Sequence, residues 1–300
     1  MRDPDLKTLR LLVAVCEHQN IKQAALQQHI EPSAISKRIA ALEAELGTPL
    51  LIRGRRGVQP TPAGEALLEH ARSMLFSLDR IAQDMAAFAG GTQGQVRLVA
   101  SASAIAESLL DDVAAFMREP AHALIKVDIE ERFSRELVRL VREGGAALGV
   151  CWDSADFTGL ETRPYRRDEL ALAVHAEHPL ARYRQLAFAD TLDFEHVGLQ
   201  PATAVHQMLK QAVAAGGGGL LRYRVIVSNF DAALRVVSAN LGIAVIPRQV
   251  GAAHAAQRGI RMVGLKDAWA RRRFAICCRP GGLPAAAERM RDYLAGLAEA

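Results

Sequence analysis

The first fifty residues carry apolar positions at the spacing of α-helices. One amphipathic helix is predicted by a ridge at steps of three and four, which consists of Leu6, Leu9, Val13 and Cys16. Asn20, a common N-cap residue, precedes a second, short helix that carries Ala24 and Ala25. This pattern predicts a small helical domain at the start of the chain.

A third helix is predicted from Pro32 to Gly47. Proline fits the first turn of a helix, where an N–H group has no intrahelical partner, and glycine commonly ends helices. The apolar ridge of this segment is formed by Ile35, Ile39, Leu42 and Leu46. Two short helices joined by a tight turn form a helix-turn-helix, whose second helix enters the major groove of DNA.

The face opposite this ridge has the chemistry that DNA requires. Small serines permit a close approach, while cations reach phosphate oxygens or guanine edges. The candidate DNA-binding residues of the helix are Pro32, Ser33, Ser36, Lys37 and Arg38. For this short segment alone, an ordinary surface helix with two basic residues is the simpler explanation.

The segment that follows favours DNA binding. No acidic residue occurs from Leu46 to Gly64, and PLLIRGRRGVQP predicts two short strands around a tip with Arg53, Arg55 and Arg56. A basic hairpin beside a recognition helix is a wing, which contacts the phosphate backbone or the minor groove. Double-stranded DNA is therefore the expected partner.

A long helix is predicted over residues 61–89. Thr61 is a candidate N-cap with Pro62 at the first helical position, and no later proline interrupts the segment. Its apolar residues alternate steps of four and three, as in a coiled-coil seam, and are Leu67, Ala71, Met74, Leu78, Ile81, Met85 and Phe88. The alternative is a helix packed along its own domain, but so regular a seam favours a homodimer. GGTQG, residues 90–94, predicts a flexible hinge.

From Gln95 the pattern changes to alternating strands and helices. VRLVA, LIKVDIEE and AALGVCW are predicted strands with helices between them. After a crossover through residues 160–181, a second unit is predicted with the strands FEHVGLQ, LRYRVIVSN and GIAVIPRQV and with helices over 203–215 and 230–239. This alternation predicts an α/β domain with largely parallel strands.

Length and composition fit a globular protein of two or three domains. The chain has 300 residues, of which 50% are hydrophobic, and its net charge of +4 permits a polyanionic partner without requiring one. No signal peptide and no apolar run of membrane length is present, so a cytoplasmic protein without membrane contact is expected. Cys16, Cys151, Cys277 and Cys278 lack metal-binding spacing, which favours reduced core thiols over redox sensing. Cys277 and Cys278 are adjacent in a predicted strand and should face opposite sides.

The N-terminal motifs together resemble the LysR-type transcriptional regulators. The matching residues are Ala24-Ala25, Ser33-Ala34-Ile35-Ser36, Leu42-Glu43, Leu46-Gly47, Arg53 to Gly57, and Thr61-Pro62-Ala63-Gly64. Two departures are Pro32, where many members have glutamine, and Leu51, where phenylalanine is usual. In the C-terminal part the resemblance extends to Val138 through Gly144, His178-Pro179-Leu180 and Gly242 through Pro247, whereas Ala147 stands where aspartate is common.

The resemblance implies an all-α winged helix-turn-helix domain plus a long linker helix, followed by an α/β, two-lobed, periplasmic-binding-protein-like effector domain. The expected divisions are a DNA-binding domain over 1–60, a dimerisation helix over 61–89, a hinge over 90–94 and an effector-binding domain over 95–300. Within the last, lobe I would comprise about 95–163 and 268–300, and lobe II about 164–267. The resemblance also implies a homodimer or homotetramer, and RNA polymerase as a partner if the protein is an activator.

Candidate effector-binding residues follow the predicted strands of both lobes. Ligands of open α/β sheets bind at the carboxyl ends of strands, where helix N-termini present free N–H groups. The candidates are Ser101, Ala102, Ser103, Cys151, Trp152, Gln200, Thr203, Ser228, Asn229 and Pro247. Each serine, threonine or asparagine alone is explained as a helix cap, and only their joint position at strand ends in both lobes indicates a site. The expected effector is a small metabolite, predicted to be anionic.

Two other classes of protein compete with a regulator. An enzyme is not expected, because no HExxH, P-loop, GxSxG or GxGxxG motif occurs, and no catalytic residue, metal or cofactor is predicted. A solute-binding protein of a transporter would share the two-lobed domain, but the predicted DNA-binding segment argues against it.

Overall fold

The computed structural model describes residues 5–54, 57–90, 94–216 and 220–298. The chain divides into two compact units, which are residues 1–90 with 143–145, and residues 91–142 with 146–300. Among the described residues, no helix combines the length and the apolar character that a membrane span requires.

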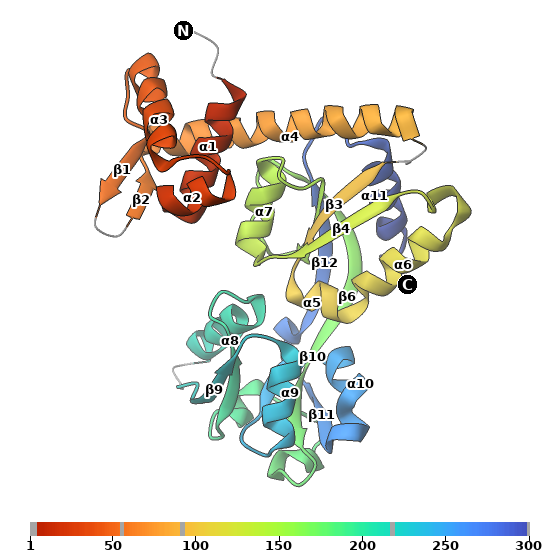
Figure 1. The fold of residues 1–300 in the computed structure, drawn as a ribbon. Helices are drawn as coiled ribbons and strands as arrows, with labels where there is room; N and C mark the ends of the chain where they lie inside the picture. Colours follow the sequence, from red (N-terminus) through yellow and green to blue (C-terminus); the bar gives the residue numbers. More distant parts are fainter. Residues whose placement is uncertain (1–4, 55–56, 91–93, 217–219, 299–300) are drawn as a thin grey trace. The chain divides into compact units, whose positions relative to one another are not determined.

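The N-terminal unit is a helical core with a small hairpin (Figure 1). Its elements are α1 (Leu6–His18), α2 (Ile21–Gln27), α3 (Pro32–Leu46), β1 (Leu51–Gly54), β2 (Gly57–Pro60) and α4 (Pro62–Gly90). Leu9 and Leu12 of α1 pack with Ile35 and Ile39 of α3 in one buried cluster. The predicted helices and hairpin are confirmed to within a few residues.

The first lobe of the second unit is built on parallel strands. β3 (Gln95–Ala100) pairs in parallel with β4 (Lys126–Glu131) and with β5 (Leu148–Trp152). One face packs against α6 (Leu110–Arg118) and α11 (Ala285–Gly296), and the other against α7 (Ser134–Arg142). β3 is followed by a continuous helical run of α5 (Ala102–Ala104), the π-helical turn η1 (Ile105–Leu109) and α6. A short 3-10 turn, η2 (Pro120–His122), precedes β4.

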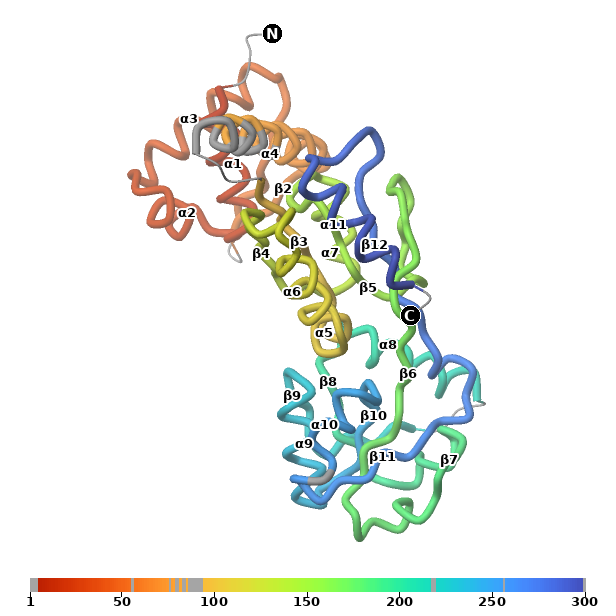
Figure 2. Tube along the Cα trace, turned by 90° about the vertical axis from the view of Figure 1, so that its right-hand side faces the viewer, coloured from red at the N-terminus to blue at the C-terminus, as the bar shows by residue number. Residues whose placement is uncertain are grey.

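Two strands connect the lobes, and Figure 2 shows both running from one lobe to the other. β6 (Glu161–His175) pairs with β12 (Arg271–Cys278) through its first half and with β10 and β11 through its second half. These pairs are antiparallel, as is β12 with β5, because one strand leaves the first lobe and the other returns to it. The predicted parallel pairing is confirmed for β3 with β4 and β5 and for β8 with β9, whereas the connecting strands, predicted only as a crossover, are antiparallel.

The second lobe has its own core. β7 (Gln185–Leu186), β8 (His196–Leu199), β9 (Tyr223–Val227), β10 (Ala244–Pro247) and β11 (Ile260–Leu265) combine with α8 (Ala204–Ala215), α9 (Phe230–Ser238) and α10 (Arg248–Arg258). Short 3-10 turns are η3 (Pro179–Arg182), η4 (Phe188–Thr191) and η5 (Ala268–Ala270). Leu172 of β6, Leu234 of α9 and Ile246 of β10 are buried together in this lobe.

All four cysteines are free thiols. Cys277 packs in the cluster on the α7 side of the sheet and Cys278 in the cluster on the α11 side, which confirms their opposite directions. Burial raises the pKa of Cys151 to about 12, and burial also raises the pKa of Cys277. Thiols that resist ionisation are poor nucleophiles, which supports a structural role.

Candidate functional site

Helix α3 presents a polar face to solvent. Pro32 occupies its first turn, and Gly47 ends it with a left-handed φ of 68°. Ile35 and Ile39 are buried, while Ser33 and Lys37 are exposed and Ser36 is half-buried. The predicted division of this helix into an apolar ridge and a polar face is confirmed.

Arg38 is less free than the sequence suggests. Its guanidinium lies 2.7 Å from the Asp5 carboxylate and donates to the Thr8 hydroxyl at 3.3 Å. Asp5 is the N-cap of α1, and its pKa is lowered by the Lys7 backbone N–H and further by Thr8 and Arg38. Sequence reasoning missed this ion pair because 33 residues separate its partners.

The β1–β2 hairpin is tied to the helices by a short backbone contact. The Val58 N–H donates to the Gln19 carbonyl at 2.9 Å, and the neighbouring Gly57 has a φ of +113°. A Cβ at Gly57 would lie 2.5 Å from the same carbonyl oxygen, so glycine is required there. Arg53 is exposed on β1, whereas the predicted tip residues Arg55 and Arg56 lie outside the described residues.

Helix α4 divides the predicted seam into a buried and an exposed part. Ala71 is fully buried and Leu67 half-buried in the core of the N-terminal unit. Further along, Met74, Ile81 and Met85 have 45%, 57% and 56% of their surface exposed. Leu78 is half-buried, and the side chain of Phe88 lies outside the described part. Self-association through this seam would therefore use the exposed residues from Met74 onward.

A pocket lies between the two lobes of the second unit. Residues from both lobes line it. Its lining includes six predicted effector residues, which are Ser101, Ala102, Ser103, Thr203, Ser228 and Asn229. Three helices of at least nine residues begin at this pocket, because Ser134 starts α7, Thr203 caps α8 and Asn229 caps α9.

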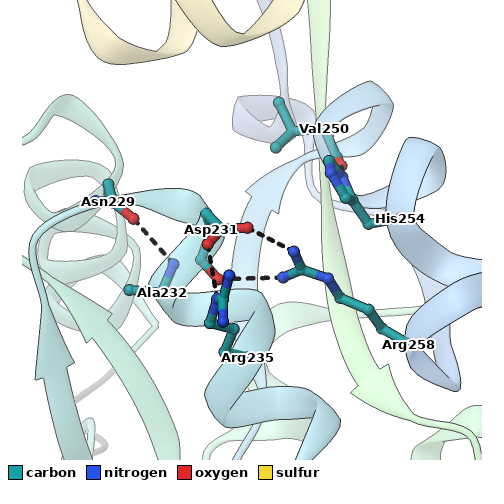
Figure 3. A network of polar contacts seen from close by, with 7 residues as sticks. All are labelled: Asn229, Asp231, Ala232, Arg235, Val250, His254 and Arg258. Carbon is teal, nitrogen blue, oxygen red and sulfur yellow. Dashed lines mark hydrogen bonds and ion pairs between the residues drawn. The ribbon is translucent and has the colours of Figure 1, made fainter.

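The lobe II side of the pocket is held by a polar network (Figure 3). Asn229 accepts a hydrogen bond from the Ala232 N–H at 2.9 Å, which fixes the start of α9. The Asp231 carboxylate lies 2.9 Å from Arg235 and 2.6 Å from Arg258 at the end of α10. Hydrogen bonds from both arginines, that of Arg235 first, lower the pKa of Asp231. The network joins α9 to α10 and so positions Asn229.

Comparison with known proteins assigns both units. Residues 6–65 match the bacterial regulatory helix-turn-helix protein, lysR family, and residues 89–298 match the LysR substrate binding domain. The chain belongs to the LysR family of transcriptional regulators. A probable HTH-type transcriptional regulator, LrrA of Synechococcus elongatus, is 32% identical over 81% of this chain and 81% of its own. The HTH-type transcriptional regulator CysL of Bacillus subtilis is 25% identical over 81% of this chain and 80% of its own.

Solved structures of LysR-family proteins share the fold. CbnR, a LysR family transcriptional regulator, superposes with a TM-score of 0.69 at 23% identity and covers 99% of this chain and 100% of its own. CbnR complexed with its target DNA gives a TM-score of 0.67 at 23% identity, over 97% and 98% of the two chains. The predicted fold class, a helix-turn-helix N-terminal domain followed by a two-lobed α/β domain, is therefore shown.

Four predicted effector residues are not among the described lining residues of this LysR-family pocket. Cys151 is buried beside α7, and Trp152 packs against the core of the second lobe. Gln200 is exposed just before α8, and Pro247 is buried at the start of α10. Strand-end position alone could not distinguish side chains that face the pocket from those that face the core.

The pocket of this LysR-family protein also contains residues that sequence reasoning missed. Arg132, Phe133 and Ser134 line it, and all three directly follow β4. The rule that identified Ser101 after β3 could have identified them too, because β3 and β4 run in parallel. Arg132 forms an ion pair with Glu130 and donates to the Glu131 carbonyl at 3.1 Å.

Proposed function

We propose that this regulator binds DNA through α3 and the β1–β2 hairpin, and that a small anionic metabolite in the interlobe pocket modulates that binding. Lys37 and Arg53 would contact phosphates or bases, together with Arg55 and Arg56. Because DNA is its target, we place the protein in the cytoplasm, with RNA polymerase as a partner if it activates promoters.

The observation that carries the effector proposal is the convergence of three helix N-termini and one cation. α7, α8 and α9 all begin at residues that line the pocket, and Arg132 lies among them. The N-terminus of a helix carries a partial positive charge and attracts anions. Glu131 also lines the pocket, so a ligand with one or two negative groups fits better than a strongly charged one.

Binding rather than catalysis suits this site. The described lining residues include serines and one threonine but no histidine or lysine, and the Glu131 carboxylate is the one possible general base among them. Ligand contacts from both lobes would differ between open and closed forms, which is what a ligand-driven change requires.

The test begins with a thermal-shift screen of small carboxylates and phosphate esters against the full-length protein. A ligand at a hundred times its Kd should stabilise the protein by about 2.7 kcal/mol. The hit should then change the affinity for promoter DNA, measured by fluorescence anisotropy.

Variants of the pocket decide where the hit binds. Arg132→Ala should weaken binding about tenfold or more, because a charge-assisted hydrogen bond is lost. Ser103→Ala should weaken it less, and Ser154→Ala, an exposed serine outside the pocket, should leave it unchanged. Equal affinity in all three variants would place the effector elsewhere.

A further inference from the structure

A second concavity lies within lobe II and is strongly basic. Its volume is about 670 Å³, and four arginines line it, which are Arg182, Arg184, Arg248 and Arg261. They come from the end of η3 and the chain after it, from the start of α10 and from β11. No aspartate or glutamate is among the described lining residues, and none of these residues belongs to the interlobe pocket.

The four arginines differ in how they are held. Arg182 donates to the Tyr183 hydroxyl at 2.8 Å, and its guanidinium stacks 4.9 Å from the centre of that ring. Arg248 lies 2.9 Å from the Glu169 carboxylate. The exposed side chains of Arg184 and Arg261 have no hydrogen bond or ion pair within the part of the chain that the structure describes. Two oriented cations and two free ones therefore share one concavity.

Gly264 explains how these side chains lie together. It pairs with Gln185 in the parallel register of β11 and β7, and its N–H donates to the Arg184 carbonyl at 3.0 Å. A Cβ at this position would lie 2.8 Å from the Gln185 side chain and 2.9 Å from Arg248 Nη2. Glycine thus leaves room at the edge of the sheet for two lining residues of the concavity.

We propose that this concavity, the arginine site, binds a small polyanion with at least two phosphate or carboxylate groups. Three of the four guanidinium groups have no acidic partner among the described residues, because only Arg248 is paired with a carboxylate, and a multivalent anion would reduce the repulsion among them. The planar guanidinium donates two parallel hydrogen bonds that match the oxygens of carboxylate or phosphate. The volume lies within the range of small-molecule pockets, and lining from three segments gives contacts from several directions.

The proposal is independent of the effector proposed above, because the two sites share no lining residue. The probes are inorganic pyrophosphate and citrate, titrated into the full-length protein by isothermal calorimetry at constant low ionic strength. We expect saturable binding of one anion per chain. A lower Kd for pyrophosphate would indicate a phosphate ligand, and a lower Kd for citrate would indicate a polycarboxylate.

Single substitutions locate the bound anion. Arg184→Ala and Arg261→Ala should each raise the Kd about tenfold or more, because each removes a charge-assisted contact. Gly264→Ala should also weaken binding, by displacing Arg248 and Gln185 without changing the charge. Arg132→Ala, in the interlobe pocket, and Arg224→Ala, on β9, should each leave the Kd within about twofold of wild type.

Two results would overturn the proposal. One is the absence of saturable binding for both probes. The other is weakening by Arg132→Ala or Arg224→Ala as large as that by Arg184→Ala, which would mean another site or a general effect of charge. Thermal unfolding of each variant, with a midpoint equal to wild type, shows that the exposed-arginine variants remain folded.

Discussion

Gly64 shows how one residue fixes the junction between the hairpin and α4. The Thr61 N–H donates to the Leu50 carbonyl at 2.9 Å, and the Thr61 hydroxyl accepts from the Gly64 N–H at 3.0 Å. A Cβ at Gly64 would lie 2.1 Å from the Leu50 carbonyl oxygen, which is part of the backbone. The Thr-Pro-x-Gly motif therefore has a steric reason in this chain.

Gly64→Ala should destabilise the N-terminal unit by about 1–3 kcal/mol, as expected for overpacking. Both tryptophans, Trp152 and Trp269, belong to the other unit, so far-UV circular dichroism should show the loss while tryptophan fluorescence does not. Gly54→Ala is the matched control, because nothing lies within 4 Å of a Cβ there. Equal destabilisation in both variants would contradict the steric explanation.

His196 should make the effector-binding domain sensitive to acid. Burial lowers the pKa of His196 from 6.5 to about 4, and its Nε2–H donates to the Thr191 carbonyl at 3.0 Å. The unfolded chain binds a proton more readily than the folded one, so the stability present above pH 6.5 is lost as pH falls toward 4. The loss is about 3 kcal/mol at most.

Urea unfolding followed by tryptophan fluorescence at several pH values measures this effect. In His196→Gln, which keeps a donor for the Thr191 carbonyl, the loss of stability between pH 6.5 and 4 should be much smaller. An unchanged pH profile in this variant would exclude His196 as the cause.

At the scale of single elements, the proposed DNA contacts of α3 predict how DNA affinity depends on salt. Lys37 is exposed on the polar face of this helix, whereas Arg38 is already paired with Asp5. Loss of one phosphate contact lowers the slope of log affinity against log salt by about one unit. Lys37→Ala should show this reduction in anisotropy titrations with promoter DNA. Arg224→Ala removes one cation from the effector-binding domain and should keep the wild-type slope.

Helix α4 offers a second element-level test. Ile81 and Met85 are exposed four residues apart on the predicted seam, so they lie on one face of the helix, where a partner helix could cover both. Ile81→Glu would bury an unpaired carboxylate in a dimer and should weaken self-association by about 3–5 kcal/mol. Ala82→Glu adds the same charge at the neighbouring exposed residue and should weaken it far less. Sedimentation velocity at low micromolar concentration compares the association states of the two variants. Equal association of Ile81→Glu and Ala82→Glu would contradict dimerisation through this seam.

A comparison of α3 with β6 shows which elements could be predicted from the sequence. α3 was predictable at both ends because Pro32 and Gly47 are local signals, and its ridge repeats at helical spacing. β6 was not, because its first half, Glu161 to Arg167, is mostly exposed and polar, and contains Pro164. A strand that links two lobes is specified by its pairing with β12, whose paired residues lie 102 to 117 positions later in the chain, and not by local pattern.

At the scale of the whole effector-binding domain, the pocket was only partly predictable. Ser101 and Ser103 of one lobe meet Thr203 and Asn229 of the other, as their places after strands suggested. Trp152 does not line the pocket, because its side chain packs against the second lobe. Direction of a side chain at a strand end depends on register, which is set by partner strands and cannot be read from one segment.

A half-buried carboxylate of lobe I, that of Glu107, lies close to the connecting strands. Glu107 lies in the π-helical turn η1, which contacts α10 of lobe II. Beside it, the fully buried Arg272 of β12 forms an ion pair with Asp168 of β6. Burial raises the pKa of Glu107 from 4.5 to about 6, and the nearby Arg272 opposes that change.

The contribution of Glu107 to stability changes with pH in the opposite direction to the contribution of His196. A carboxyl with a raised pKa holds its proton more tightly in the folded protein, so stability is highest below pH 4.5 and falls as pH rises through 6. The shift from 4.5 to about 6 corresponds to about 2 kcal/mol at most, and to about 1 kcal/mol once solvent screening of this half-buried group is allowed for.

Glu107→Gln keeps the shape of the side chain and removes its titration, so tryptophan-monitored stability should depend on pH more steeply than in wild type between pH 4.5 and 6. In His196→Gln the remaining Glu107 contribution should instead make stability decline with rising pH across the same range. The double variant lacks both contributions, so its stability should change least with pH among the four proteins. If Glu107→Gln follows the wild-type profile, the pKa of Glu107 is the same in the folded and the unfolded protein, and burial does not raise it.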